Sequence, residues 1–295
     1  MSIEIGKTFS LARHALAMED DRWVYSEALL PKNALSSVVF VAYPLRRFYS
    51  LEQSEVIESG VVDILGAYST LMQAYDRYSD TSEALPSLSE IRQDSVLSEL
   101  VGEVVKQVDI AEMGMWQRRG LIKLINRSRY NLYQIEQKYS RRELSSSEAF
   151  KWKEATGGAL LSSLVAIFNK CFYIDCVDLE HSAYWYGANI QLLDDMADVG
   201  PDILAKRQTP VASLLRERGE FGRVANHIHA GRRYSFGTLR KLAPETIFSV
   251  EQKRREYFNR VSPLFTLDGY HQIADTSLTP LIFSLYSAAS RRVSH

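Results

Sequence analysis

The sequence contains one dense group of side chains suited to binding a metal ion. In the segment from Gln191 to Asp198, the carboxylates Asp194, Asp195 and Asp198 fall within one helical turn. On a helix, Asp194 and Asp198 share a face, and Asp195 lies about 100° round from Asp194. The stripe behind Asp194 is small or apolar apart from one amide: Ala183, Gly187, Ile190 and Gln191. An inward-looking carboxylate pair of this kind suits Mg²⁺, which takes oxygen ligands and keeps several waters.

A second acidic pair, Asp76 and Asp80, stands upstream with the same four-residue spacing. Its stripe runs back through largely apolar positions: Met72, Ser69 and Leu65. If the two acidic helices face each other, they would hold a metal cluster that binds a diphosphate, with Asp76 and Asp194 as catalytic ligands. Taken alone, Asp76 and Asp80 are better explained as solvated helix surface, and the later cluster is explained equally well either way. The interpretation therefore rests on both clusters together.

Basic residues near the second acidic motif are candidates for binding the diphosphate: Lys153, Lys206, Arg207 and, later in the chain, Arg233. A Lys or Arg at such a site neutralises oxygen charge as a C–O bond breaks. Ordinary surface charge is the competing interpretation for each of them. Gln191, in the same segment as Asp194, is a further candidate for substrate binding.

The elements that must position these residues are predicted to be helices. Apolar residues recur at helical spacing in two stretches: Ile64, Leu65, Tyr68, Met72 and Tyr75, and then Leu160, Leu161, Leu164, Phe168 and Phe172. Glycines and prolines are sparse, and no stretch alternates with period two. We expect about ten helices, with breaks at Asp80–Ser89, Arg142–Ser147, Gly200-Pro201, Leu242–Glu245 and Ser262-Pro263. Gly157 and Gly158 interrupt a helical run, and close helix packing is the favoured reason.

Composition narrows the class of protein. Of the 295 residues, 46% are hydrophobic, enough for a sizeable core, and the net charge of -1 points neither to nucleic acid nor to anionic lipid. The two cysteines, Cys171 and Cys176, set no disulfide framework and fit a reducing cytoplasm. The longest apolar stretch, Ala159–Phe168, is too short to span a bilayer. No linker argues for a second domain, so we expect residues 1–295 to form one all-α domain, a helical bundle with a central active-site cavity.

Several of these sequence motifs resemble motifs of a known enzyme superfamily. Gln191 to Asp198 has the form Q-x-x-D-D-x-x-D, which resembles the second aspartate-rich motif of trans-prenyl diphosphate synthases, and Gly200 to Pro210 resembles the basic Thr/Pro segment that follows it there. Asp76-x-x-x-Asp80 is similar to the first motif of squalene and phytoene synthases and of bacterial large-terpene synthases. The resemblance covers roughly residues 67–215 and implies an all-α class I isoprenoid synthase that uses Mg²⁺, with Asp76, Asp80, Asp194, Asp195 and Asp198 as metal ligands.

Differences from the chain-elongating enzymes favour a single substrate. Tyr75 stands where a doubled aspartate would be, and the early Gly-Lys-x-x-Arg segment is missing. No Arg-Arg pair follows Asp80 at the spacing where chain-elongating enzymes bind isopentenyl diphosphate. We therefore expect a terpene synthase that ionises an allylic prenyl diphosphate and converts the carbocation to a cyclic or linear terpene. The alternatives are a prenyltransferase, chain-elongating or head-to-head, and a non-enzymatic helical adaptor. The expected partner is the prenyl diphosphate, with room for a peripheral membrane contact for product release and for a homodimer.

Overall fold

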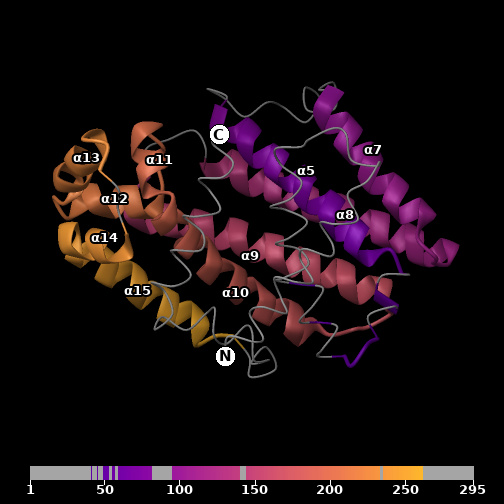
Figure 1. The fold of residues 1–295 in the computed structure, drawn as a ribbon. Coiled ribbons are helices and arrows are strands. Elements are labelled where there is room, and N and C mark those ends of the chain that lie inside the picture. The colour runs from indigo at the N-terminus through magenta and orange to yellow at the C-terminus, as the bar shows by residue number, and fades with distance from the viewer. Residues whose placement is uncertain are drawn as a thin grey trace. The chain divides into compact units, whose positions relative to one another are not determined.

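The computed structural model describes residues 59–81, 95–139, 144–232 and 235–261, with a few positions between 41 and 56. These residues form ten helices with defined bounds and no strand (Figure 1), which confirms the all-α prediction. Within the described ranges, no helix combines the length and the apolar character needed to cross a membrane.

The helices belong to two compact units, which we describe one at a time. Unit 1 holds α5 (Val61–Thr81) and α7 (Ser95–Ile110), with α8 up to Tyr130 and residues 163–171 of α9. The rest of α8 (Met115–Tyr139) and α9 (Ser146–Cys171) belongs to unit 2. Unit 2 also contains α10 (Val177–Ala197), α11 (Val199–Leu204), α12 (Pro210–Glu217), α13 (Phe221–His229), α14 (Phe236–Leu242) and α15 (Pro244–Phe258). That residues 1–295 form a single domain stays a prediction.

Unit 1 is built on the apolar stripe of α5 that the sequence predicted. Ile64, Leu65, Tyr68 and Met72 are all buried, as expected from their helical spacing. Where α5, α7 and α8 meet, Leu71 and several valines of α7 line a cavity of about 10 Å³. That volume suits roughly one water and is far too small for a prenyl chain. The central active-site cavity therefore stays a prediction.

Unit 2 has its core around the end of α10. Leu192, Leu193 and Met196 are fully buried against apolar residues of α12 and α15. A polar bridge fixes α15 on α10, because Arg254 Nε donates to Asn189 Oδ1 and Asn189 Nδ2 donates to the Arg254 carbonyl, each at 3.0 Å. Both side chains are completely buried, so these hydrogen bonds act where water cannot compete.

Helix ends follow local chemistry. Ser145 and Glu148 form a capping box before α9, since the Glu148 N–H donates to Ser145 Oγ (3.3 Å) and the Ser145 N–H donates to Glu148 Oε2 (3.2 Å). Pro244 begins α15, as expected from the predicted break. The acidic helix ends at Ala197 rather than at Gly200-Pro201. Pro201 lies in the first turn of α11, where its missing N–H needs no partner, so it helps to begin the next helix. Ser262-Pro263 lies outside the described residues, as do residues 82–89, which follow the end of α5.

A close helix contact in unit 2 occurs where α9 crosses α10 at three glycines. A Cβ on Gly157 would lie 2.7 Å from the Gly187 carbonyl oxygen and 2.7 Å from Gln191 Cβ. A Cβ on Gly158 would lie 2.6 Å from the ring of Tyr184. The two helices run antiparallel here. Gly157 lies against Gln191, whereas Leu161, later in α9, lies against Gly187, earlier in α10. The interpretation of Gly157 and Gly158 as packing residues is confirmed.

Substitution at this crossing should destabilise the protein. In Gly187→Ala, the new methyl group would collide with the Gly157 carbonyl and lie 2.8 Å from Leu161 Cβ. The helices must then move apart, which should lower the free energy of unfolding by about 1–3 kcal/mol in urea titrations. The control is Gly102→Ala in α7, where a Cβ meets nothing within 4 Å and alanine's higher helix propensity should add up to about 1 kcal/mol. Equal effects of the two substitutions would contradict the crossing.

Candidate functional site

The end of α10 and the start of α11 carry four carboxylates. Asp194 and Asp195 lie in the last turn of α10, and Asp198 is the N-cap of α11. The Asp198 N–H donates to the Asp194 carbonyl oxygen at 2.9 Å, and the Asp202 N–H donates to the Asp198 carbonyl oxygen at 2.9 Å. Because the helical turn continues through Asp198, Asp194, Asp198 and Asp202 recur every four residues along one face.

Sequence reasoning missed Asp202 as a site residue. It lies in the segment compared with the isoprenoid synthases, but Gly200-Pro201 was expected to break the helix before it. The signal that could have identified Asp202 is the four-residue spacing from Asp194 to Asp198, repeated once more. The backbone hydrogen bond from Asp202 to Asp198 shows why that spacing still applies across the short gap between α10 and α11.

The four carboxylates differ in burial. Asp195 and Asp202 each expose only 4% of their surface, whereas Asp194 and Asp198 are half-buried. Gln191 hydrogen-bonds to the Asp195 carboxylate, but Asp195 Oδ2 is buried with no hydrogen-bond partner in the part of the chain that is described. An unsatisfied buried carboxylate oxygen is costly, and a native protein normally gives it a ligand, an ion or a water.

Two cations from other segments compensate part of this negative charge. Lys153 of α9 is near enough to lower the pKa of both Asp195 and Asp202. Its Nζ also lies 4.6 Å from the centre of the Trp152 ring. Arg207 Nη1 lies 3.6 Å from Asp202 Oδ1, and the Arg207 side chain remains 44% exposed. The glycine crossing explains the position of Lys153, since Lys153 lies one turn before Gly157 and Gln191 lies one turn after Gly187.

Burial dominates the protonation of this cluster. The pKa of Asp195 is raised to about 8 and that of Asp202 to about 7, and burial is the largest cause of both shifts. Lys153 opposes the rise at both groups, and Arg207 opposes it at Asp202. The remaining carboxylates of the cluster add to it: Asp202 and Asp194 for Asp195, and Asp198 and Asp194 for Asp202. Near neutral pH both carboxyl groups therefore retain a substantial share of their protons.

The other predicted diphosphate ligands lie in different surroundings. Lys206 is exposed, with a left-handed backbone (φ 57°), in the turn that follows α11. Arg207, the next residue, is held in that turn by a hydrogen bond of 2.8 Å from its N–H to the Asp202 carbonyl oxygen. Arg233 lies outside the described residues. Of the predicted cations, the described structure therefore associates Lys153 and Arg207 with the carboxylates.

The first acidic motif belongs to the other unit. The backbone of Asp76 and Asp80 lies in α5 of unit 1, as predicted for a helical pair, and their side chains are outside the described set. The second motif belongs to unit 2. The expectation that the two motifs face each other across a metal cluster stays a prediction.

The residues of the second motif fit a metal that is shared with a substrate. Among the described side chains, no three from His, Cys, Asp and Glu are grouped to hold one ion by themselves. Mg²⁺ is commonly held in another way, by one or two carboxylates together with waters and substrate phosphates. Asp194 and Asp198 suit that role, because they are half-buried, one turn apart and beside two further carboxylates. The donor set fits Mg²⁺ bound together with a phosphate-bearing ligand.

Aromatic side chains form a cluster in each unit. In unit 1, Phe168 packs against Phe172 (ring centres 4.9 Å apart) and Tyr49 (6.5 Å). In unit 2, Trp185 contacts Tyr184 (5.2 Å) and Tyr257 (5.7 Å). The Arg260 guanidinium lies 4.2 Å from the centre of the Trp185 ring. A cation therefore already lies against the Trp185 ring of this unit 2 cluster.

Comparison with known proteins identifies no relative. No protein-family profile matches the chain, and neither a curated protein nor a solved structure is significantly similar to it. Any function proposed for the chain therefore rests on the arrangement of its own residues.

The buried carboxylates should make stability depend on pH. The folded protein keeps protons on Asp195 and Asp202 that the unfolded chain releases near pH 4. Their contribution to the free energy of unfolding is full below about pH 4 and is lost as the pH rises through about 7–8. Asn has the shape of a protonated Asp but has no proton to lose. The free energy of unfolding of Asp195→Asn, relative to that of wild type, should therefore increase by a few kcal/mol as the pH rises across this window.

Urea titrations from pH 4 to 9 in chelator-containing buffer provide the measurement. Asp178→Asn serves as the control, since Asp178 is an exposed aspartate in the first turn of the same helix. A constant stability difference between Asp195→Asn and wild type over the whole range would contradict the buried, proton-binding state of Asp195.

Proposed function

We propose that this chain is a terpene synthase resembling the class I isoprenoid synthases, which ionises an allylic prenyl diphosphate with Mg²⁺. The observation that carries the proposal is the acidic face at the end of α10. Asp194, Asp198 and Asp202 recur along it every four residues, beside the buried Asp195. Lys153 and Arg207 accompany these carboxylates. Carboxylates for cations beside cations for phosphate are the combination that diphosphate chemistry requires.

The carboxylates have two different roles in this proposal. Asp194 and Asp198 are half-buried and would hold Mg²⁺ directly. Asp195 and Asp202 are more deeply buried, and they would add negative potential, unscreened by water, once a bound cation has displaced their protons. Binding of a divalent cation would lower their pKa values and release protons. Asp76 and Asp80 of α5 would supply the second set of metal ligands.

The basic residues would act on the leaving group. When the C–O bond of the substrate breaks, both bonding electrons leave with the diphosphate oxygen, and its negative charge grows. Lys153 and Arg207 would stabilise that charge more strongly than they stabilise the intact substrate, which is how a binding group speeds the reaction. Bound Mg²⁺ would supply Lewis-acid stabilisation of the same oxygens. The allylic cation would then cyclise or lose a proton in apolar surroundings.

Product analysis separates this proposal from the alternatives. The chain is incubated with Mg²⁺ and a panel of prenyl diphosphates, and inorganic diphosphate and the organic extract are measured. A terpene synthase releases diphosphate and a hydrocarbon or alcohol from one allylic substrate. A chain-elongating prenyltransferase needs isopentenyl diphosphate as well, and a head-to-head enzyme joins two allylic molecules. A helical adaptor releases no diphosphate with any substrate, and that result would contradict the proposal.

Mg²⁺ and diphosphate should each strengthen the binding of the other. The clustered carboxylates bind cations poorly on their own because no three of the described side chains surround one ion. A diphosphate supplies the missing oxygens and gains from the charge of the metal, so the coupling is reciprocal. Asp194→Asn keeps the helix but removes one ligand charge, and should abolish turnover and most of the coupling. Asp76→Asn should act in the same direction.

Calorimetric titration of diphosphate with and without Mg²⁺ measures this coupling. Asp178→Asn, on an exposed turn at the far end of α10, should behave as wild type. Full turnover and Mg²⁺-dependent diphosphate binding in Asp194→Asn would show that the motif does not bind the metal.

The two neighbouring cations after α11 should differ in their effects. Arg207 is tied to the acidic cluster, so Arg207→Ala should weaken inhibition of turnover by inorganic diphosphate by roughly tenfold, the loss of one charge-assisted hydrogen bond. Lys206 is exposed in a left-handed turn, and Lys206→Asn preserves that backbone. It should have a smaller effect, similar to that of the surface control Lys151→Ala. Unchanged inhibition in Arg207→Ala would identify Arg207 as a structural partner of Asp202 only.

A further inference from the structure

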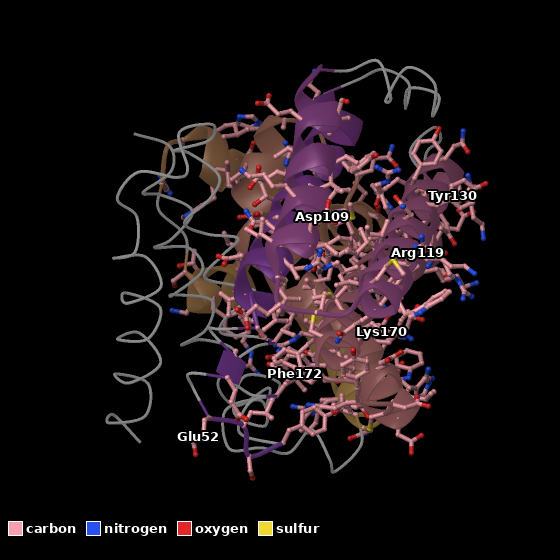
Figure 2. All side chains as sticks on the ribbon, turned by 90° about the vertical axis from the view of Figure 1, so that its right-hand side faces the viewer. Glu52, Asp109, Arg119, Tyr130, Lys170 and Phe172 are labelled. Carbon is pink, nitrogen blue, oxygen red and sulfur yellow. The ribbon has the colours of Figure 1, made fainter. Side chains whose placement is uncertain are left out.

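Within unit 1, α8 exposes a face of unusual composition. Trp116, Arg119, Lys123, Arg127 and Tyr130 are all exposed, and they follow one another at intervals of three or four residues. They therefore form a single stripe roughly 21 Å long. Figure 2 labels Arg119 and Tyr130 on this side of the molecule. The opposite face of α8, with Leu121 and Ile125, is buried in the core.

This stripe is strongly basic. Residues 115–130 of α8 contain no acidic side chain, although the chain as a whole has a net charge of -1. In the described part of the chain, Arg119, Lys123 and Arg127 form no ion pair. Lys170 of α9 adds a fourth cation, because a Cβ on Gly120 would lie 3.0 Å from Lys170 Cε and 3.5 Å from its Nζ. Lys170 also lies on the side of the molecule shown in Figure 2.

An exposed apolar patch adjoins the start of the stripe. Ile110, Met115, Trp116 and Tyr173 each expose between 59% and 76% of their surface. The Tyr173 hydroxyl lies 3.7 Å from the position of a Cβ on Gly114, so Tyr173 stands beside the turn that begins α8. The Arg119 guanidinium lies 5.5 Å from the centre of the Trp116 ring and joins the patch to the stripe. Large apolar residues gathered on a surface mark an interaction site more often than single ones do.

We propose that this surface binds an anionic lipid membrane, with the apolar patch inserted at the headgroup level and the basic stripe lying along the headgroups. Trp and Tyr favour that depth because their rings are apolar and their polar atoms remain hydrated. Lys and Arg are attracted by the negative surface potential of anionic lipids.

The aliphatic members of the patch distinguish a membrane from a polynucleotide. Ile110 and Met115 gain from an acyl environment but offer no flat ring on which a base can stack. Asp109 and Glu112 are exposed near the patch and oppose binding to anionic lipid there. The electrostatic attraction therefore comes from the stripe on α8, and the patch contributes through burial of apolar surface. This inference does not depend on the proposed chemistry at α10.

Vesicle co-sedimentation of the full chain tests the proposal. The vesicles contain phosphatidylcholine alone or with about one-third phosphatidylserine. Wild type should bind the anionic vesicles more tightly, and added salt should weaken that binding. Each basic residue at such a surface contributes on the order of fivefold. The triple variant Arg119→Gln, Lys123→Gln, Arg127→Gln should therefore lose on the order of a hundredfold in partitioning. Trp116→Ala should lose several-fold on both kinds of vesicle.

The matched control is Lys151→Gln, Arg240→Gln, Lys241→Gln, which removes the same charge from exposed positions of unit 2. It should bind as wild type, as should Asp194→Asn, which separates this proposal from the proposed catalysis. Circular dichroism checks that all variants remain helical. Equal binding of the two triple variants, or no preference for phosphatidylserine, would overturn the proposal. Binding of polyuridylate but not of vesicles would overturn it in favour of a polynucleotide partner.

Discussion

The close crossing of α9 and α10 at Gly157, Gly158 and Gly187 is the constraint on which the candidate site depends. Backbone meets backbone there, so the two helices have no side-chain layer between them at that point. Residues one turn away on each helix are consequently brought within electrostatic reach. Lys153 of α9 thus acts on carboxylates of α10 and α11 that lie more than forty positions later in the chain. The loss of helix propensity at three glycines is the cost of this arrangement.

Burial then divides four chemically identical carboxylates into two kinds. Asp194 and Asp198 keep contact with solvent, whereas Asp195 and Asp202 are enclosed, which raises their pKa values to about 8 and about 7. A protein gains no stability from enclosing two carboxylates in this way, since each has a desolvation cost that Lys153 and Arg207 offset only in part. Titratable groups displaced so far by desolvation and specific neighbours are characteristic of functional sites. These shifts support the proposal that the acidic cluster binds a cation.

The surface of α8 shows that the net charge of the whole chain does not predict the charge of one face. A net charge of -1 says nothing about where the charges lie, and here three cations and two aromatic residues occupy one face of a single helix segment. The opposite face of that segment supplies the core of unit 1. Because the core side is fixed by packing, the basic side must face outwards, and the apolar residues at its start are exposed with it.

The sequence by itself determined the helical class, the starts of α9 and α15 and the acidic motif, because these depend on local spacing. Capping residues such as Ser145 and Pro244 act within one turn, and apolar periodicity predicted the buried face of α5. Only the tertiary structure decided which carboxylates are enclosed, that Asp202 joins them and that the glycines pack helix against helix. Periodicity groups residues on a face, but non-local contacts decide what covers that face. The expected pairing of the α5 and α10 motifs would also be a non-local relation, and spacing along the chain cannot determine it.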